Sequence, residues 1–230
     1  RRCQVAHSGQ SLHRHRPFLE SPAKCARLSG LSTSAMQDWG GTHERVTAMK
    51  GIVFVELLKM AENLLGEAAV DQVLDDTPLS TGGAFSAVGD YPCADLVALV
   101  GAFSRVTNLP GDELQRRFGH WMMNTFKTYY PAFFEDKPDV LAMLEAIEGE
   151  VHVEVRKIYP SAELPTFATE RLGPGELRMD YSSTRPLVPF CAGLIEGCVD
   201  HFGRPATITT CDLSPPGQAR AEFTIRHDMP

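Results

Sequence analysis

The sequence predicts an α+β fold in which helices come first and an antiparallel sheet comes last. Apolar residues recur at helical spacing from Met49 to about Pro160, and beyond Pro160 the period of the apolar residues changes from 3.6 to 2. A run of helices followed by a run of strands is typical of α+β proteins, in which the two kinds of element are segregated.

The helical part begins abruptly after Met49, where apolar residues line one face of a first helix that Gly66 ends. A short second helix runs to about Leu74, and a glycine-rich loop follows from Pro78 to Pro92. Further helices are expected at 94–107 and 112–126, and a long helix between Pro138 and Pro160.

The C-terminal part alternates apolar and polar residues, which is typical of half-buried strands. A helix from about Pro186 to Phe202 interrupts this alternation and is expected between the second and third strands. The predicted strands are Thr166–Leu172, Glu176–Ser183, Ala206–Leu213 and Ala219–Arg226.

Residues 1–48 differ in composition from the rest of the chain. They are rich in Arg, His, Ser and Gly, lack an apolar period, and carry seven Lys/Arg against three Asp/Glu, compared with fifteen against twenty-six in residues 49–230. We therefore expect an unstructured tail or a non-native extension over 1–48, with an organelle transit peptide as the alternative. The folded domain is expected over 49–230.

Composition excludes several classes of protein. The net charge is -7 and the acidic part lacks basic stripes, which argues against nucleic acid as a partner. The sequence has no apolar run long enough to span a membrane. Its six cysteines include no CxxC motif and do not resemble a disulfide framework, so a reducing cytoplasm is the expected location.

His152 lies in the predicted long helix, beside its apolar stripe, because each residue advances a helix by about 100°. A neutral imidazole that projects from a helix into an apolar space can be an axial ligand of haem iron. The alternative is a histidine that is only packed in the core or exposed at the surface.

The strand that ends in Tyr181-Ser182-Ser183-Thr184-Arg185 has a mixed face. Leu177, Met179, Tyr181, Ser183 and Arg185 alternate, so they share one side of an extended strand. That side begins apolar and ends in three hydrogen-bond donors, one of which has the planar fork that suits carboxylates. It would suit an amphipathic ligand with an acidic edge, unless the strand is a half-exposed edge strand with polar residues facing water.

Five segments follow one another in an order that is typical of a known family: Met49–Phe54, Tyr130–Phe134, Glu150–Val155, Tyr181–Arg185 and Gly193–Gly197. Through these segments, residues 49–230 resemble the H-NOX (haem nitric oxide/oxygen binding) family. The resemblance implies a helical N-terminal lobe packed on a C-terminal lobe with an antiparallel sheet, and haem b between the lobes.

The resemblance also implies roles for single residues. By position, His152 is similar to the family's iron ligand, and Tyr181, Ser183 and Arg185 are similar to the residues that hold the haem propionates. Pro165 resembles the proline that presses against the porphyrin and distorts it.

On the distal side of the haem, Phe190 stands where oxygen-binding members of the family have a tyrosine. Because phenylalanine has no hydroxyl, the resemblance favours nitric oxide sensing over oxygen sensing. The other distal residues that it implies are Val53, Leu57, Met122 and Phe126.

The function implied is a gas sensor with NO and CO as ligands, in which release of His152 alters the surface shown to a partner. In the family, that partner is a histidine kinase or a cyclic-di-GMP enzyme in trans, or a cyclase domain in the same chain. We expect no catalytic activity. Two alternatives stay open: an enzyme in which His152 and Arg185 act on a small carboxylated substrate, and a haem carrier.

Some relatives also bind zinc through Cys and His residues near the C-terminus. Here Cys191 and Cys198 are too far apart along one helix to share an ion. Cys198, His201 and Cys211 could converge, but the family's pattern is incomplete, so buried packing is the expected role of these thiols.

Overall fold

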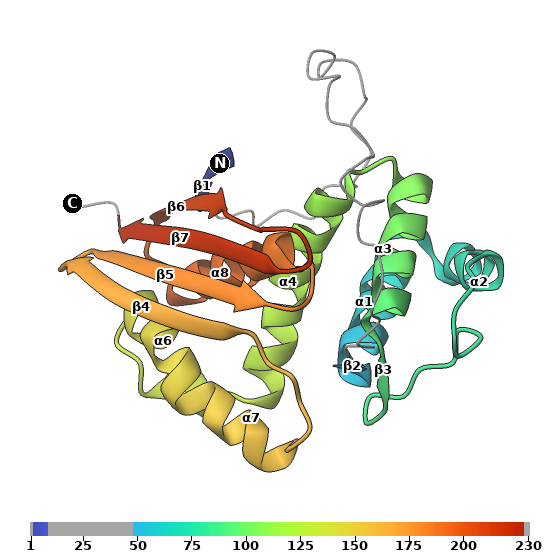
Figure 1. Cartoon of the computed structure of the whole chain (residues 1–230), viewed down its shortest axis with the longest axis horizontal. Coiled ribbons are helices and arrows are strands. Elements are labelled where there is room, and N and C mark those ends of the chain that lie inside the picture. The colour runs from blue at the N-terminus through green and yellow to red at the C-terminus, as the bar shows by residue number, and fades with distance from the viewer. Residues whose placement is uncertain (1, 9–47, 228–230) are drawn as a thin grey trace.

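The computed structural model describes residues 2–8 and 48–227, which form a helical lobe and a sheet lobe joined by one long helix (Figure 1). The helical lobe contains a two-stranded sheet and three helices, and α4 (Gly111–Tyr129) leads from it into the sheet lobe. Its elements are β2 (Ala48–Lys50), α1 (Gly51–Leu65), α2 (Glu67–Asp76), β3 (Asp90–Pro92) and α3 (Cys93–Thr107).

The sheet lobe is built on an antiparallel sheet with the strand order β1-β6-β7-β5-β4. One face of this sheet packs against α8 (Val188–Phe202) and α6 (Val140–Ala146), because alternate residues of the strands are apolar and buried there. The strands are β1 (Arg2–Ser8), β4 (Thr166–Gly173), β5 (Glu176–Ser183), β6 (Ala206–Asp212) and β7 (Ala219–His227).

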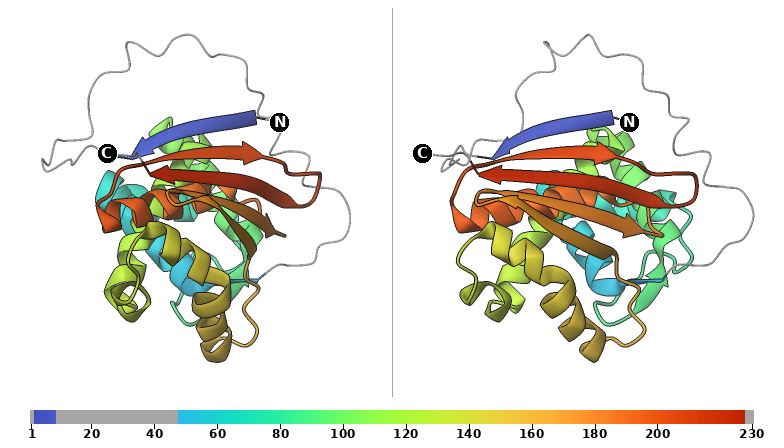
Figure 2. Two further views of the ribbon diagram at one scale, coloured as in Figure 1. Left: turned by 90° about the vertical axis from the view of Figure 1, so that its left-hand side faces the viewer. Right: turned by 60° about the vertical axis from the view of Figure 1, so that its left-hand side comes forward.

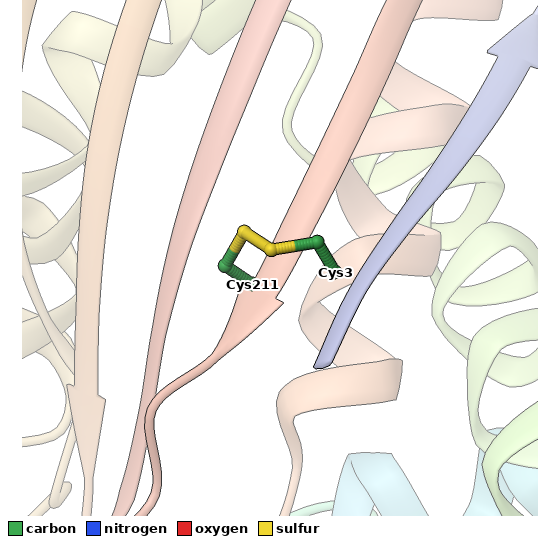
Figure 3. The surroundings of a disulfide bond; sticks show 2 residues. All are labelled: Cys3 and Cys211. Carbon is green, nitrogen blue, oxygen red and sulfur yellow. A yellow bond between two sulfur atoms is a disulfide. The ribbon is translucent and has the colours of Figure 1, made fainter. Parts of the chain in front are cut away.

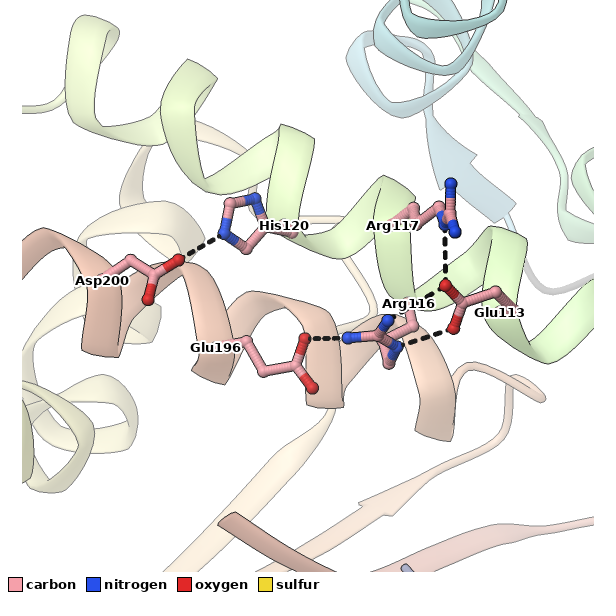
Figure 4. Close-up of polar contacts among 6 residues, drawn as sticks. All are labelled: Glu113, Arg116, Arg117, His120, Glu196 and Asp200. Carbon is pink, nitrogen blue, oxygen red and sulfur yellow. Dashed lines mark hydrogen bonds and ion pairs between the residues drawn. The ribbon is translucent and has the colours of Figure 1, made fainter. Parts of the chain in front are cut away.

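Helices α4 and α8 approach each other closely because glycines line their contact. A Cβ atom added at Gly193 would lie 1.8 Å from the backbone oxygen of Arg116, and one at Gly119 would lie 2.0 Å from that of Phe190. Ion pairs flank this contact (Figure 4), among them Arg116 with Glu196, whose Nη1 and Oε2 atoms are 2.5 Å apart. The two lobes are therefore joined through a tightly packed helix pair.

The structure confirms the α+β fold class and the order of its elements. Each predicted helix and strand is present, with ends that differ from the predicted ones by a few residues. The alternation along β5 is confirmed as well: Leu177, Met179, Tyr181 and Ser183 are buried, and β5 lies between β4 and β7. The alternative of a half-exposed edge strand is therefore wrong.

The predicted long helix is not regular. Its first part is α6, its middle is the π-helical turn η2 (Ile147–Val151), and its last part is α7 (His152–Ile158). The expected apolar stripe is buried at Val140 and Leu144, whereas the side chain of Ile158 is 57% exposed. The stripe thus packs into the body only along the first part of the helix. A short helix, α5 (Ala132–Glu135), was also not predicted.

The N-terminal segment corrects two expectations. Arg2–Ser8 forms β1, which pairs antiparallel with β6 at the edge of the sheet (Figure 2), so these residues are not unstructured. Cys3 and Cys211 lie opposite each other in this pairing and form a disulfide (Figure 3), although no disulfide was expected. Sequence patterns near residue 3 could not show this, because both the pairing and the bond join segments 208 residues apart.

The rest of the predicted tail, residues 9–47, lies outside the described residues. The assignment of 49–230 as one domain stays a prediction.

Candidate functional site

The candidate site begins at His152, the first residue of α7, directly after the π-helical turn. Such a turn holds one residue more than a regular helical turn and is often found at functional sites. The His152 side chain is buried, with 8% of the residue exposed. The irregular turn therefore sets the direction in which this imidazole leaves the helix.

A carboxylate fixes one nitrogen of the His152 ring. The Nδ1 atom lies 3.0 Å from Oε2 of Glu148, one helical turn earlier. Burial lowers the pKa of His152, and the hydrogen bond to Glu148 opposes this effect only in part. A neutral ring must donate through Nδ1–H, because an ionised carboxylate only accepts, and Nε2 is then left with a free lone pair. This is the form of histidine that binds iron.

Glu148 is itself held by several donors. Arg156 Nη2 donates to Oε1 at 2.9 Å, and the Phe167 amide donates to Oε2 at 3.2 Å. Partial burial would raise the pKa of Glu148, but these hydrogen bonds and the one from His152 outweigh it, so the pKa is lowered. Glu148 therefore stays ionised near neutral pH and ties the π-helical turn to the first residues of β4.

The polar end of β5 lies buried in the same lobe. Tyr181, Ser183 and Arg185 alternate along the chain, and each of them is less than a tenth exposed. Burial raises the pKa of Tyr181 far above its ordinary value, so its hydroxyl keeps its proton and remains a donor. The Ser183 hydroxyl accepts from the amide of Arg185 at 3.0 Å, which fixes the bend after the strand.

Arg185 connects three segments. Its guanidinium donates to the backbone oxygen of Glu163, in the link between α7 and β4, and to the backbone oxygen of Ala48, in β2. Its Nε atom is buried and has no partner within the part of the chain that the structure describes. A buried donor without an acceptor is costly, so a carboxylate of a ligand would be a favourable partner.

Phe167 links the histidine to the β5 row. It lies opposite Tyr181 in the pairing of β4 with β5, and its ring is 5.6 Å from the rings of both His152 and Tyr181. Phe167 therefore connects His152 to Tyr181, the first of the three predicted clamp residues. Pro165 is half-buried and lies just before β4.

The five predicted distal residues gather at the core of the helical lobe, although Phe190 comes from α8, which packs on the sheet. Leu57 and Met122 are completely buried in its core, and Val53, Phe126 and Phe190 pack against that core. They come from three helices, α1, α4 and α8, and none carries a hydroxyl group. Phe126 packs against the cores of both lobes, so this apolar group borders the lobe that holds His152.

Comparison with known proteins agrees with this arrangement. A model of the Haem-NO-binding family matches residues 50–210, which is more than half of the chain. The chain belongs to the Haem-NO-binding family. Members of this family are haem-binding domains that sense gases. No curated protein matches the chain.

Solved structures of H-NOX proteins resemble this Haem-NO-binding chain over most of its length. The unliganded Fe(II) H-NOX protein from K. algicida is 32% identical, with a TM-score of 0.74, and the match covers 79% of this chain and 98% of that one. The Fe(II)NO form of an H-NOX protein from S. oneidensis is 22% identical, with a TM-score of 0.70, and covers 79% and 100%. The second comparison shows the fold alone.

The zinc hypothesis finds no support in this member of the family. Cys211 is bonded to Cys3, and Cys198 is buried, which raises the pKa of its thiol to about 12. Between residues 2 and 8 and between 48 and 227, no group of three His, Cys, Asp or Glu residues could hold a metal ion.

Among the helices of the described residues, none combines the length and the hydropathy that a membrane-spanning segment requires.

Sequence reasoning missed two residues of the site. Glu148 could have been found, because it precedes His152 by four residues and such pairs meet on a helix. Phe167 had no comparable signal, since its contact with His152 depends on how β4 packs against the π-helical turn.

Proposed function

We propose that this chain is a haem-based sensor of nitric oxide, with haem b held noncovalently between the two lobes. The observation that supports it best is the buried, neutral His152, whose Nδ1 is committed to Glu148 and whose Nε2 is free for iron. The haem would supply an iron atom that binds diatomic gases.

The residues present fit the two kinds of group that a haem offers. His152 would hold the iron, and its tautomer is already the one that this bond requires. Tyr181, Ser183 and Arg185 would hold the propionates, because two hydroxyls and a guanidinium are buried on one face of β5 and the segment after it. The unpaired Nε of Arg185 is a donor that a propionate could use.

The distal residues would decide which gas is bound. A polarised ligand such as oxygen is retained by a nearby hydrogen-bond donor, and the side chains of Val53, Leu57, Met122, Phe126 and Phe190 offer none. Nitric oxide and CO depend less on such a donor. An apolar distal side therefore supports selectivity for NO and CO over oxygen.

Release of His152 would transmit the signal. His152 lies between the buried first part of its helix and the exposed end at Ile158, so a change in its position would alter a surface that a partner can contact. We propose that this partner is a histidine kinase, a cyclic-di-GMP enzyme or a linked cyclase domain. The chain would itself act as a regulatory domain, without catalysis. The disulfide between Cys3 and Cys211 removes the reason for expecting a reducing cytoplasm, so no location is proposed.

Absorption spectra of the purified protein test this proposal. The protein should contain haem, and the ferrous form should change its spectrum with NO and with CO but not in air. Absence of haem, or a stable complex with oxygen, would contradict the proposed function. A spectrum that changes with none of the gases would favour a haem carrier.

A further inference from the structure

Glu148 holds a position that the roles described above do not fully explain. Its two carboxylate oxygens receive three donors from different parts of the sheet lobe: the ring of His152, the guanidinium of Arg156 and the amide of Phe167. Its side chain is only 34% exposed, and it lies within the π-helical turn that precedes His152. An ordinary surface salt bridge has one partner and is exposed, so these features set Glu148 apart from one.

The two oxygens of Glu148 have different partners. Oε1 accepts from Arg156 at 2.9 Å, whereas Oε2 accepts from His152 at 3.0 Å and from the Phe167 amide at 3.2 Å. The carboxylate is thus held from the helix and from β4 at once. Such a fixed acceptor holds the imidazole in one orientation and keeps its proton on Nδ1.

An acceptor of this kind also changes the other nitrogen of the ring. A carboxylate that accepts a hydrogen bond from Nδ1–H gives the ring partial imidazolate character and makes Nε2 a stronger electron donor to a metal. Hydrogen bonding of this type is one of the means by which a protein adjusts the properties of haem iron.

We propose that Glu148 is a positioning residue that strengthens the bond between His152 and haem iron, and thereby sets how readily nitric oxide releases His152. The inference rests on the proposed function. Arg156 acts in the opposite sense, because it withdraws charge from the same carboxylate. The pair Glu148 and Arg156 therefore adjusts the sensor's threshold.

Resonance Raman spectra of the ferrous, ligand-free protein measure the iron–histidine stretch and test this inference. The frequency should fall from wild type to Glu148→Gln, whose neutral amide oxygen can still accept a hydrogen bond from Nδ1–H, and fall further in Glu148→Ala. In Glu148→Ala the haem affinity should also fall about 10-fold, as is usual when the partner of a metal-bound histidine is lost. Arg156→Ala leaves Glu148 in place and should raise the frequency.

The matched control is Glu154→Gln. Glu154 lies on the same helix and pairs with Lys157 rather than with the histidine, so its replacement should leave the stretch unchanged. The haem-free protein gives a second readout, because ¹⁵N NMR of the histidine rings should show the His152 proton on Nδ1 in wild type and a mixture of tautomers in Glu148→Ala.

The outcomes separate the two proposals. The role of Glu148 would be overturned if haem is bound through His152 and the iron–histidine frequency is the same in wild type, Glu148→Gln and Glu148→Ala. The sensor proposal would then remain intact. If Glu148 variants do not fold, an unchanged stretch in Arg156→Ala would overturn it equally. The sensor proposal itself would be contradicted if the protein binds no haem, or if its haem binding does not change when His152 is replaced.

Discussion

The Nη2 atom of Arg185 donates a hydrogen bond of 2.5 Å to the backbone oxygen of Ala48, so a residue after β5 in the sheet lobe is tied to the strand that precedes α1. The same guanidinium holds the link between α7 and β4. A propionate that binds Arg185 would thus contact a residue that forms hydrogen bonds with both lobes.

Arg185→Ala should weaken haem retention. The substitution removes charge-assisted hydrogen bonds worth ~1.5 to 3 kcal/mol each, so haem affinity should fall at least about 10-fold. Transfer of haem to an acceptor protein measures this loss. Arg178→Ala is the matched control, because Arg178 lies on β5, the strand that precedes Arg185, is partly exposed and pairs with Glu170. Wild-type retention in Arg185→Ala would exclude a propionate contact.

His152→Gly should lose haem or keep it only when imidazole is added. The substitution would remove the proposed bond between the protein and haem iron, and free imidazole could occupy the space that the ring leaves. Absorption spectra with and without imidazole show the result, and His120→Ala, at a half-exposed histidine of α4, is the control. An unchanged spectrum in His152→Gly would mean that another residue binds the iron.

Phe190→Tyr should shift the protein towards oxygen binding. Phe190 packs on Phe118 at the edge of the helical core, with ring centres 5.0 Å apart, and the substitution adds a hydroxyl to this apolar group. We expect the wild-type ferrous protein to remain without oxygen in air and the variant to form a measurable fraction of an oxygen complex. Stable oxygen binding by the wild type would refute the proposed selectivity.

Nitric oxide and CO should have different effects on amide hydrogen exchange between Val140 and Tyr159. If His152 holds haem iron as proposed, NO should release His152 and CO should leave it bound. A full shift between two positions of the helix needs a difference in binding free energy of ~5.5 kcal/mol. We expect faster exchange near the π-helical turn with NO, and little change with CO. Equal exchange patterns would remove the basis for a switch at His152.

Gly193→Ala should destabilise the protein regardless of haem. The added Cβ would meet the backbone of Arg116 at 1.8 Å, so α4 and α8 must separate, and overpacking of this kind costs about 1 to 3 kcal/mol or more. Chemical denaturation measures the loss. Gly173→Ala is the control, because nothing lies within 4 Å of its added Cβ. Equal stability of both variants would contradict the close approach of the two helices.

Much of this fold could be predicted because its signals are local. Alternation predicted that Tyr181 and Ser183 lie on the buried face of β5, because every second residue of a strand points to the same face. It also predicted the burial of Arg185, two residues beyond the strand. The helical spacing likewise located α1 and α8. The resemblance to a family then pointed to His152, which spacing alone could not distinguish from an ordinary core histidine.

The features that were missed depend on contacts between distant segments. The π-helical turn adds one residue to an otherwise regular helix, and the spacing of apolar residues around Ile147 does not distinguish such a turn from a regular helix. The pairing of β1 with β6 brings Cys3 to Cys211 from opposite ends of the described chain, and no pattern within either strand contains that information.

Helix α4 carries neighbouring residues that belong to different cores. Met122 is buried in the core of the helical lobe and Met123 in that of the sheet lobe, because consecutive side chains leave a helix about 100° apart. A rotation of α4 about its axis would therefore move side chains in both cores at once. A displacement of α4 beside the sheet would in this way change the packing around Leu57 and Phe118 in the helical lobe.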